Sequence, residues 1–283
     1  MKFPGPGARP NGWAREFLRQ VTSPGKRVAA FVSKTLVIAE LELRKIRHDP
    51  TELLTRAIQP ALWLLVFGQV FGRARAIPTG GLPYLDFMAP GILAQSVLFI
   101  AIFHGIAIIW ERDLGLVHKL LATPTPRTAL VLGKGISAGA RALSQVAIVY
   151  VLALLLGVRI NWHPLALAGV LSIGILGAAC FSILSLIIAC WVKTRERFMG
   201  IGQVLTMPLF FASNAIYPIS MMPEWLKVVS HLNPLTYEVD ALRALMLAGG
   251  TSVIGLVPDL GVLLMATLVL VIIGGWMYPR IAV

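Results

Sequence analysis

Residues 165–192 read LALAGVLSIGILGAACFSILSLIIACWV, a run of 28 residues that contains no Asp, Glu, Lys or Arg. About 20 apolar residues in a helix cross the hydrocarbon core of a bilayer, so this run predicts a helix that spans a membrane. Of the 283 residues in the chain, 57% are hydrophobic and only 13% are charged, whereas an ordinary soluble domain has roughly 25% charged residues. The composition therefore excludes a soluble globular protein.

Five further runs lack Asp, Glu, Lys and Arg, namely residues 57–72, 87–110, 142–158, 198–223 and 260–279. Flanking turns bring the shorter runs to the required length, because the long stems of basic residues such as Arg56 and Arg141 reach the lipid headgroups. We therefore predict an all-α membrane protein with six membrane-spanning helices. Their expected bounds are about 54–73, 87–110, 138–158, 165–192, 198–222 and 259–279.

Positive charges near the ends of these spans are distributed unequally. Thirteen Lys and Arg residues fall on one side of the membrane and five on the other. Loops rich in Lys and Arg stay in the cytosol, so we expect the first side, and with it both chain termini, to be cytosolic. The net charge of +12 fits cytosolic loops and anionic membrane lipids, and it disfavours nucleic acid as a partner.

Residues 1–32 form a separate region that is rich in Gly, Pro and basic side chains. They contain no apolar stretch of the kind that a secretory signal needs. Such a composition is typical of a segment without a core of its own. We therefore expect a flexible, basic, cytosolic leader, followed by one transmembrane domain over residues 33–283.

A first segment that does not span the membrane covers residues 33–48. Its apolar residues recur at helical spacing, while charged residues occupy much of the remaining surface. Glu40 and Arg44 are placed for an i,i+4 ion pair. This pattern predicts an amphipathic helix that lies on the inner surface of the membrane.

A second such segment lies between spans five and six. Two short helical patterns, at residues 224–232 and 235–247, are split by an Asn-Pro pair and are too short or too charged to cross. We expect a re-entrant helical hairpin on the outer side, packed against neighbouring helices. Asp240 and Arg243 stand three residues apart, with Glu238 nearby, and this spacing predicts an ion pair.

The sequence lacks the sites that would make the chain an enzyme. The Gly133-Lys134 pair is followed by glycine instead of Ser or Thr, so it does not form a phosphate-binding loop. Gly135-Ile-Ser-Ala-Gly139 matches a hydrolase nucleophile pattern, but small residues at this spacing in a membrane helix favour a helix-packing face. No Cys or His spacing predicts a metal site. Any ATP hydrolysis would occur on a separate polypeptide.

Polar residues inside the spans are the remaining candidates for a function. None of the six runs contains a carboxylate, which disfavours a transporter coupled to protons or sodium ions. Exposure of an amide, hydroxyl or imidazole to lipid would leave its hydrogen bonds unmet, so these groups should face protein or a translocation route. The alternative is that they serve hydrogen bonding between helices alone. They include Gln59, Gln95, His104, Gln203, Thr206 and Asn214.

Two stretches carry a resemblance to a known family. Residues 111–127, ERDLGLVHKLLATPTPR, followed by LVLGK at 130–134, resemble the cytosolic loop of type-2 ABC exporter permeases, especially the daunorubicin-resistance-type branch. Residues 211–226, FASNAIYPISMMPEWL, with NPLTYEVDALR at 233–243, are similar to the end of the fifth helix and the outer hairpin of that family. The resemblance covers roughly residues 33 to 283.

The resemblance implies a permease half that dimerises, with a second copy or with a related permease, in a prokaryotic cell membrane. An ABC ATPase dimer would dock on the cytosolic face and bind ATP and Mg, so this chain would carry no cofactor of its own. The surface helix and the loop after span two would be the docking elements. The candidate ATPase-coupling residues are Glu40, Arg44, Arg47, Glu111, Arg112, Asp113 and Lys119.

The resemblance also implies that spans one, two and five line a translocation route at the dimer interface. The candidate route residues are Gln59, Trp63, Gln95, His104, Gln203, Thr206 and Asn214, and the outer-hairpin candidates are Glu238, Asp240 and Arg243. Members of the family export drugs, lipids, glycolipids and polysaccharide chains. Few aromatic residues lie inside the spans, which favours an amphipathic drug or lipid over a polysaccharide or lipid-linked glycan. A membrane signalling or assembly subunit, driven by an ATPase without transport, is an alternative of a different class.

Overall fold

The structure of the chain is a computed structural model that describes residues 57–74, 77–121, 127–192 and 194–282, apart from the side chains of residues 119–121, 129 and 282. The described residues are almost all helical, and their one β-type pairing is an isolated bridge between Ile160 and Leu247. The predicted all-α fold is confirmed for this part of the chain. The elements are η1 (Trp63–Phe67), α4 (Gly68–Ala74), α5 (Tyr84–Phe103), α6 (Gly105–Asp113), α7 (Leu116–Leu121), α8 (Arg127–Leu155), α9 (Pro164–Ala189), α10 (Arg195–Phe211), η2 (Ile219–Met221), α11 (Glu224–Leu232), α12 (Pro234–Met246), α13 (Leu256–Met277) and η3 (Tyr278–Ala282).

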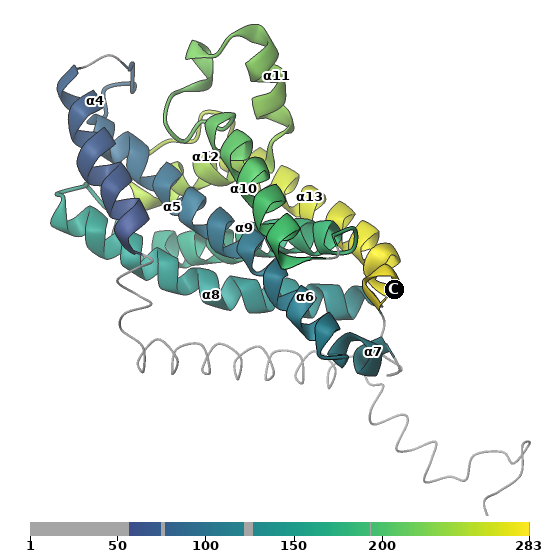
Figure 1. Cartoon of the computed structure of the whole chain (residues 1–283). Helices are drawn as coiled ribbons and strands as arrows, with labels where there is room; N and C mark the ends of the chain where they lie inside the picture. The colour runs from purple at the N-terminus through teal and green to yellow at the C-terminus, as the bar shows by residue number, and fades with distance from the viewer. Residues whose placement is uncertain (1–56, 75–76, 122–126, 193, 283) are drawn as a thin grey trace, which may run out of the picture.

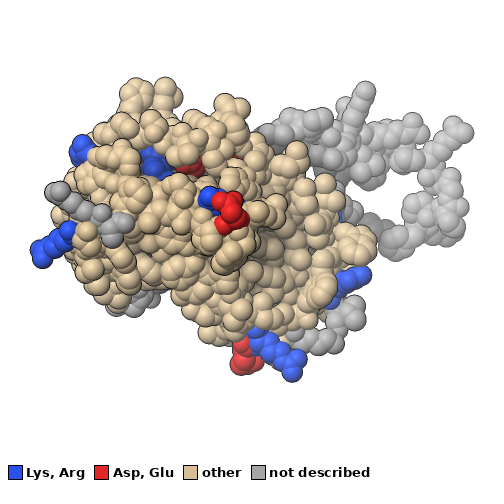
Figure 2. Space-filling model, turned by 90° about the horizontal axis from the view of Figure 1, so that it is seen from above, with Lys and Arg blue, Asp and Glu red and all other residues tan. Residues whose placement is uncertain are grey.

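Four helical segments among the described residues are long and apolar enough to cross a bilayer: Tyr84–Asp113, Leu130–Leu155, Pro164–Ala189 and Leu256–Ile281. They coincide with the second, third, fourth and sixth spans expected from the sequence. The face of the molecule in Figure 2 is largely uncharged, with charged atoms in a few isolated places. Apolar surface of this extent is suited to contact with lipid or with another apolar protein surface.

The other two expected spans differ from these four segments. Residues 57–74 are helical, with the π-helical turn η1 in the middle, but residues 54–56 of the first expected span lie outside the described residues. α10 ends at Phe211, whereas the sequence predicts a fifth span that continues to residue 222. The predicted end of this helix is therefore wrong.

Side-chain hydrogen bonds, one of them from α12, account for the early end of α10. The Ser213 hydroxyl donates to the carbonyl oxygen of Phe210 at 2.7 Å, and the N–H of Ala215 donates to Ser213 Oγ at 3.3 Å. Such side-chain bonds compete with the helical ladder. Arg243 of α12 then donates to the carbonyl oxygen of Asn214 at 2.7 Å and holds the turn. Hydropathy does not detect these hydrogen bonds, so the uncharged run predicts a helix that is too long.

α8 and α9 pack as a helical hairpin whose contact is set by small residues. An added Cβ at Gly139 would lie 2.7 Å from Cγ2 of Ile175, and one at Gly135 would lie 3.3 Å from Cβ of Ala179. Glycine at these two positions allows close approach of the helices, so the predicted helix-packing face is confirmed. α8 begins at Arg127, before the expected start of span three at residue 138, and thus includes the whole motif.

α5 and α6 are two parts of one long segment that is interrupted at His104. The Ser185 hydroxyl of α9 donates to the carbonyl oxygen of Ile102, just before the interruption, and so competes with the helical ladder there. Gly105 allows the approach, because an added Cβ would lie 2.5 Å from Cζ of Phe198. The interruption therefore lies where α9 and α10 contact this segment.

The two short helices predicted between α10 and α13 are confirmed as α11 and α12, and their bounds agree with the prediction to within one residue. Asn233 caps α12 through Oδ1, which accepts from the N–H of Leu235 at 3.0 Å, and Pro234 occupies the first helical position. α12 is mostly buried. Figure 1 shows α11 at the opposite end of the bundle from α7 and the C terminus, and we name these ends the α11 end and the α7 end.

The unequal distribution of positive charge predicts which end faces the cytosol. Thr251 is exposed near the α11 end and His118 is exposed on α7. With Cys180 and Cys190 replaced by alanine, a single cysteine at Thr251 should react with a membrane-impermeant maleimide in intact cells. A single cysteine at His118 should react only after the membrane is opened, because the positive-inside rule assigns the α7 end to the cytosol. Equal reaction of both positions in intact cells would contradict this orientation.

Candidate functional site

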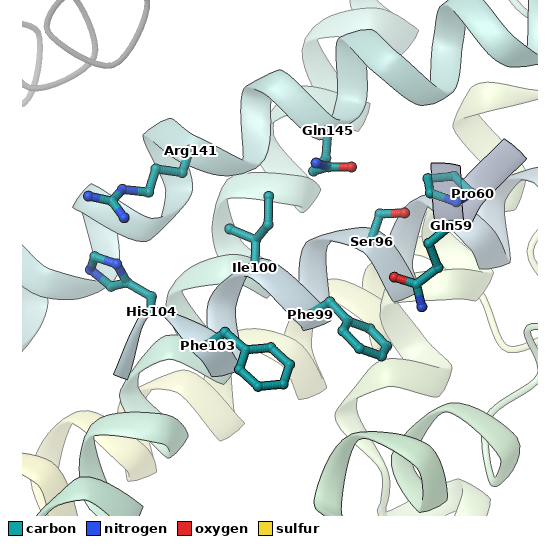
Figure 3. Close-up of a pocket in the computed structure, with 9 residues that line it drawn as sticks. All are labelled: Gln59, Pro60, Ser96, Phe99, Ile100, Phe103, His104, Arg141 and Gln145. Atoms are coloured by element: carbon teal, nitrogen blue, oxygen red, sulfur yellow. The ribbon is translucent and has the colours of Figure 1, made fainter. Parts of the chain in front are cut away.

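A cavity of about 300 Å³ opens between α5, α8 and the helical residues 57–62. We name it the polar pocket. Figure 3 shows His104 and Arg141 at one end of the polar pocket and Gln59 with Pro60 at the other. The described residues that line it are Gln59, Pro60, Ser96, Phe99, Ile100, Phe103, His104, Arg141 and Gln145.

The lining follows from helical periodicity. Four residues of α5 and His104 directly after it stand at spacings of three and four, so they share one face of this helical segment. Arg141 and Gln145 are four residues apart on α8 and likewise point the same way. The Ser96 hydroxyl donates to the carbonyl oxygen of Ile92 at 2.8 Å, which satisfies its one donor inside its own helix. Polar groups of α5 and α8 thus face each other across the polar pocket.

Buried polar groups in the pocket have capacity for a ligand. His104 is 7% exposed, and neither of its ring nitrogens has a hydrogen-bond partner among the described residues. The Gln145 side chain is also buried and can both donate and accept. Phe99 and Phe103 stack at 5.9 Å between ring centroids and provide an apolar wall. The arrangement can hold a molecule with a polar group at one end and an apolar body.

The structure brings together only part of the predicted route set. Gln59 and His104 both line the polar pocket, whereas Gln95 is buried outside its lining. Trp63 packs in an aromatic cluster, 5.4 Å from Phe210 of α10 between ring centroids. The cluster joins the helix of residues 57–74 to α10.

The three remaining route candidates lie on or after α10. Gln203 is exposed on the outside of that helix, and Thr206 is buried with its hydroxyl donating to the carbonyl oxygen of Gly202 at 2.6 Å. Asn214 follows α10 and lines a second cavity of about 560 Å³ near the α11 end, together with Arg243. The predicted set is therefore divided among the polar pocket, α10 and the α11 end.

Of the nine described residues that line the pocket, only Gln59 and His104 belong to the predicted route set. The sequence places Arg141 at the membrane boundary and indicates no role for Gln145 or Phe99. The four-residue spacing of Arg141 and Gln145 in an otherwise apolar helix is the signal that could have identified them. Which neighbouring helix they would face could not be read from that spacing.

A cluster of charges at the α7 end contains three predicted coupling residues. Glu111 forms an ion pair with Lys134 of α8. Arg112 donates to the carbonyl oxygen of Val192 at 3.3 Å, and Asp113 accepts from Arg195 of α10 at 3.0 Å. These contacts join the end of α6 to α8 and to the beginning of α10.

Arg195 strengthens this junction in a second way. Its guanidinium carbon lies 3.7 Å from the ring centroid of Trp110 in α6. Arg195 at the beginning of α10 therefore contacts α6 twice, through the ion pair with Asp113 and through the Trp110 ring. Of the other predicted coupling residues, Glu40, Arg44 and Arg47 lie outside the described residues, as does the side chain of Lys119.

The predicted charges of the outer hairpin are all buried in α12. Arg243 lies 3.7 Å from Asp240, which is the predicted ion pair, and its guanidinium carbon lies 4.0 Å from the ring centroid of Phe87 in α5. Glu238 packs against Gly177 of α9, and neither of its carboxyl oxygens has a hydrogen-bond partner among the described residues. Arg243 therefore holds α12 against α5, while Glu238 lies where α12 approaches α9 closely.

Comparison with known proteins identifies relatives across most of the chain. A family model described as ABC-2 type transporter matches residues 33–247. Daunorubicin resistance ABC transporter permease protein DrrB1 of Streptomyces coeruleorubidus is 28% identical over 231 residues, 81% of each chain. Nodulation protein J of Sinorhizobium fredii is 28% identical over 185 residues, 64% of this chain and 70% of the relative. Inner membrane transport permease YadH of Escherichia coli K12 is 26% identical over 219 residues, 75% of this chain and 80% of the relative.

Proposed function

The chain belongs to the ABC-2 type transporter family, and from this premise we propose that it is the permease subunit of an ATP-driven exporter. It would move an amphipathic drug or lipid-like molecule out of the cytoplasm or the inner leaflet. The observation that carries the proposal is the polar pocket, because it combines the buried imidazole of His104, whose ring nitrogens have no hydrogen-bond partner among the described residues, with an apolar wall inside a bundle of apolar helices. Its size suits a headgroup or a part of a larger molecule.

The energy for transport would come from a separate ABC ATPase dimer at the α7 end. The junction of α6, α8 and α10 supports this proposal, because a force on the end of α6 reaches α10 through Asp113 and Arg195. The same helix leads to His104 in the polar pocket. Glu111, Arg112 and Asp113 would therefore transmit docking at the α7 end to the pocket.

The proposed architecture in the membrane has six spans with both termini in the cytosol. Residues 57–74 and α10 would complete the set begun by the four long segments, and α11 with α12 would form an outer re-entrant hairpin. Exposed apolar residues on both added helices support contact with a second permease copy or with lipid, among them Leu62, Val66 and Val204. The inner membrane relative YadH supports location in a prokaryotic cell membrane.

Filling the polar pocket tests this function. The complex of the chain with its ATPase is reconstituted in liposomes, and ATP-dependent movement of daunorubicin and of a fluorescent phospholipid is measured. The Ser96→Phe variant should lose about tenfold or more in transport, equivalent to ~1.4 kcal/mol, because the ring occupies the cavity. Ser172→Phe is the matched control, since Ser172 makes the same hydrogen bond to the residue four before it but lies on an exposed face of α9.

Both variants should assemble with the ATPase as the wild type does. Transport by Ser96→Phe at the wild-type rate would exclude the polar pocket as the substrate site. ATP hydrolysis by the purified chain, free of any ATPase subunit, would overturn the proposed division of labour between the two chains.

A further inference from the structure

Ser252, in the loop before α13, lies between two buried carboxyl groups. Its Oγ is 2.8 Å from Oδ2 of Asp240 on α12 and 2.8 Å from Oδ2 of Asp259 in the first turn of α13. The backbone N–H of Gly255 donates to the same Oγ at 2.6 Å. One hydroxyl therefore contacts three polar groups, two of which are ordinarily negative at neutral pH.

The hydrogen-bonding capacity of a serine hydroxyl decides how these contacts can coexist. A hydroxyl has one proton to donate and two lone pairs that accept. Gly255 occupies one lone pair, and the single proton can satisfy only one carboxylate. The second carboxyl contact is favourable only if that carboxyl group supplies a proton to the other lone pair.

Asp240 has the environment of an ionised carboxylate. Its Oδ2 accepts from the N–H groups of Val253 and Ile254 at 2.8 and 2.9 Å, and Arg243 lies 3.7 Å from its Oδ1. Bonds from N–H donors and a nearby cation favour the charged form. A protonated Asp240 would lose part of this stabilisation.

Asp259 has the environment of a neutral acid. Its side chain is 1% exposed, and its Oδ1 has no hydrogen-bond partner among the described residues. Oδ1 of Asp240 also has no hydrogen-bond partner among the described residues, but it faces the Arg243 guanidinium at 3.7 Å. An ionised Asp259 would leave a charged oxygen buried without a donor, whereas a neutral acid leaves only a carbonyl oxygen. We propose that the carboxyl group of Asp259 is protonated and that its O–H donates a hydrogen bond to Oγ of Ser252. The Ser252 hydroxyl in turn donates to Asp240, so two consecutive hydrogen bonds connect α13 to α12.

The contact between α12 and α13 through Ser252 would therefore depend on pH. Loss of the proton would set two carboxylates against one hydroxyl and weaken the loop at residues 252–255. The charged neighbours are Asp240 and Arg243 of α12, with Glu238 two residues before Asp240 on the same helix, close to Gly177 of α9. The family match ends at residue 247, before Ser252 and Asp259.

Infrared spectroscopy of the full chain in lipid nanodiscs measures the proton directly through the carbonyl stretch of a protonated carboxyl group. The Glu238→Gln background is used, because Glu238 is a second buried carboxyl group. This background should show the stretch at mildly acidic pH, above the range in which a free aspartate titrates, and adding Asp259→Asn should abolish it. Asparagine keeps the shape and can donate to Ser252, so the fold should persist.

Two further variants make the assignment specific. Asp86→Asn is the matched control, because Asp86 is also buried near the α11 end but forms an ion pair with Arg159 at 2.9 Å. It should leave the stretch unchanged. Ser252→Ala should shift the stretch to higher frequency, since the acid loses its acceptor. Absence of the stretch in the Glu238→Gln background, or its survival in Asp259→Asn, would overturn the proposal.

The pH dependence of stability provides an independent reading. Folding would take up one proton at Asp259, so the Tm should fall as the pH rises above the range in which a free aspartate titrates. The Asp259→Asn variant has no such proton, and its Tm should fall less over the same range. Identical slopes for the two proteins would also contradict a protonated Asp259.

Discussion

Replacing Arg243 with alanine should destabilise the folded chain by about 3–5 kcal/mol, because removal of one partner leaves a buried charge uncompensated. Asp240 is fully buried and lies 3.7 Å from the guanidinium. The variant also loses the 2.7 Å hydrogen bond to the carbonyl oxygen of Asn214 and the contact with the Phe87 ring. Thermal unfolding in detergent and the yield of monodisperse protein measure the effect.

The same hairpin contains a matched control for Arg243→Ala. Lys227 pairs with Glu224 on α11 at 2.7 Å, again three residues apart, but the pair is solvent-exposed. Lys227→Ala should change the stability by less than about 1 kcal/mol. Equal stability of the Arg243→Ala and Lys227→Ala variants would contradict the buried role of Arg243.

A double variant separates the ion pair from the rest of the site. Asp240→Asn together with Arg243→Gln should be milder than the sum of the two single changes, since neither leaves the other as a lone buried charge. Strict additivity would indicate that the two side chains do not interact. Asp240 also accepts from Ser252 and two backbone N–H groups, so some cost should remain in the double variant.

Replacing Gly91 with alanine should destabilise the chain by about 2–3 kcal/mol, because a side chain there meets a backbone that cannot move aside. An added Cβ would lie 2.5 Å from the carbonyl oxygen of Ala215 and 2.7 Å from its Cα. Gly91 is on α5, so displacement of the helix would also disturb Ser96 in the polar pocket. Thermal unfolding and the transport assay should therefore decline together.

Gly133→Ala is the control for this substitution. Gly133 also lies inside a helix, α8, but an added Cβ there meets no atom within 4 Å. Alanine costs less backbone entropy than glycine in a helix, so this variant should be unchanged or more stable by about 0.5–1 kcal/mol. A Gly91→Ala variant that behaves like Gly133→Ala would show that the contact with Ala215 is easily relieved.

The sequence by itself determined the class of fold and most of the long helices. Uncharged runs identify membrane helices because burying charge in lipid is so unfavourable that hydropathy alone selects the spans. The sequence also predicted features that depend only on neighbouring residues, such as the start of a helix. Asn233 and Pro234 mark the start of α12 in the sequence, because capping involves residues within one turn.

The tertiary structure decided which helix faces pack against each other. Arg141 and Gln145 join His104 in one pocket because α8 packs beside α5, and no local pattern specifies that neighbour. α10 ends early because Ser213 and Arg243 take carbonyl oxygens at its end, which hydropathy does not register. Hydrophobic transfer energy depends on each residue's own side chain, whereas hydrogen bonds and close packing depend on atoms brought together from distant parts of the chain.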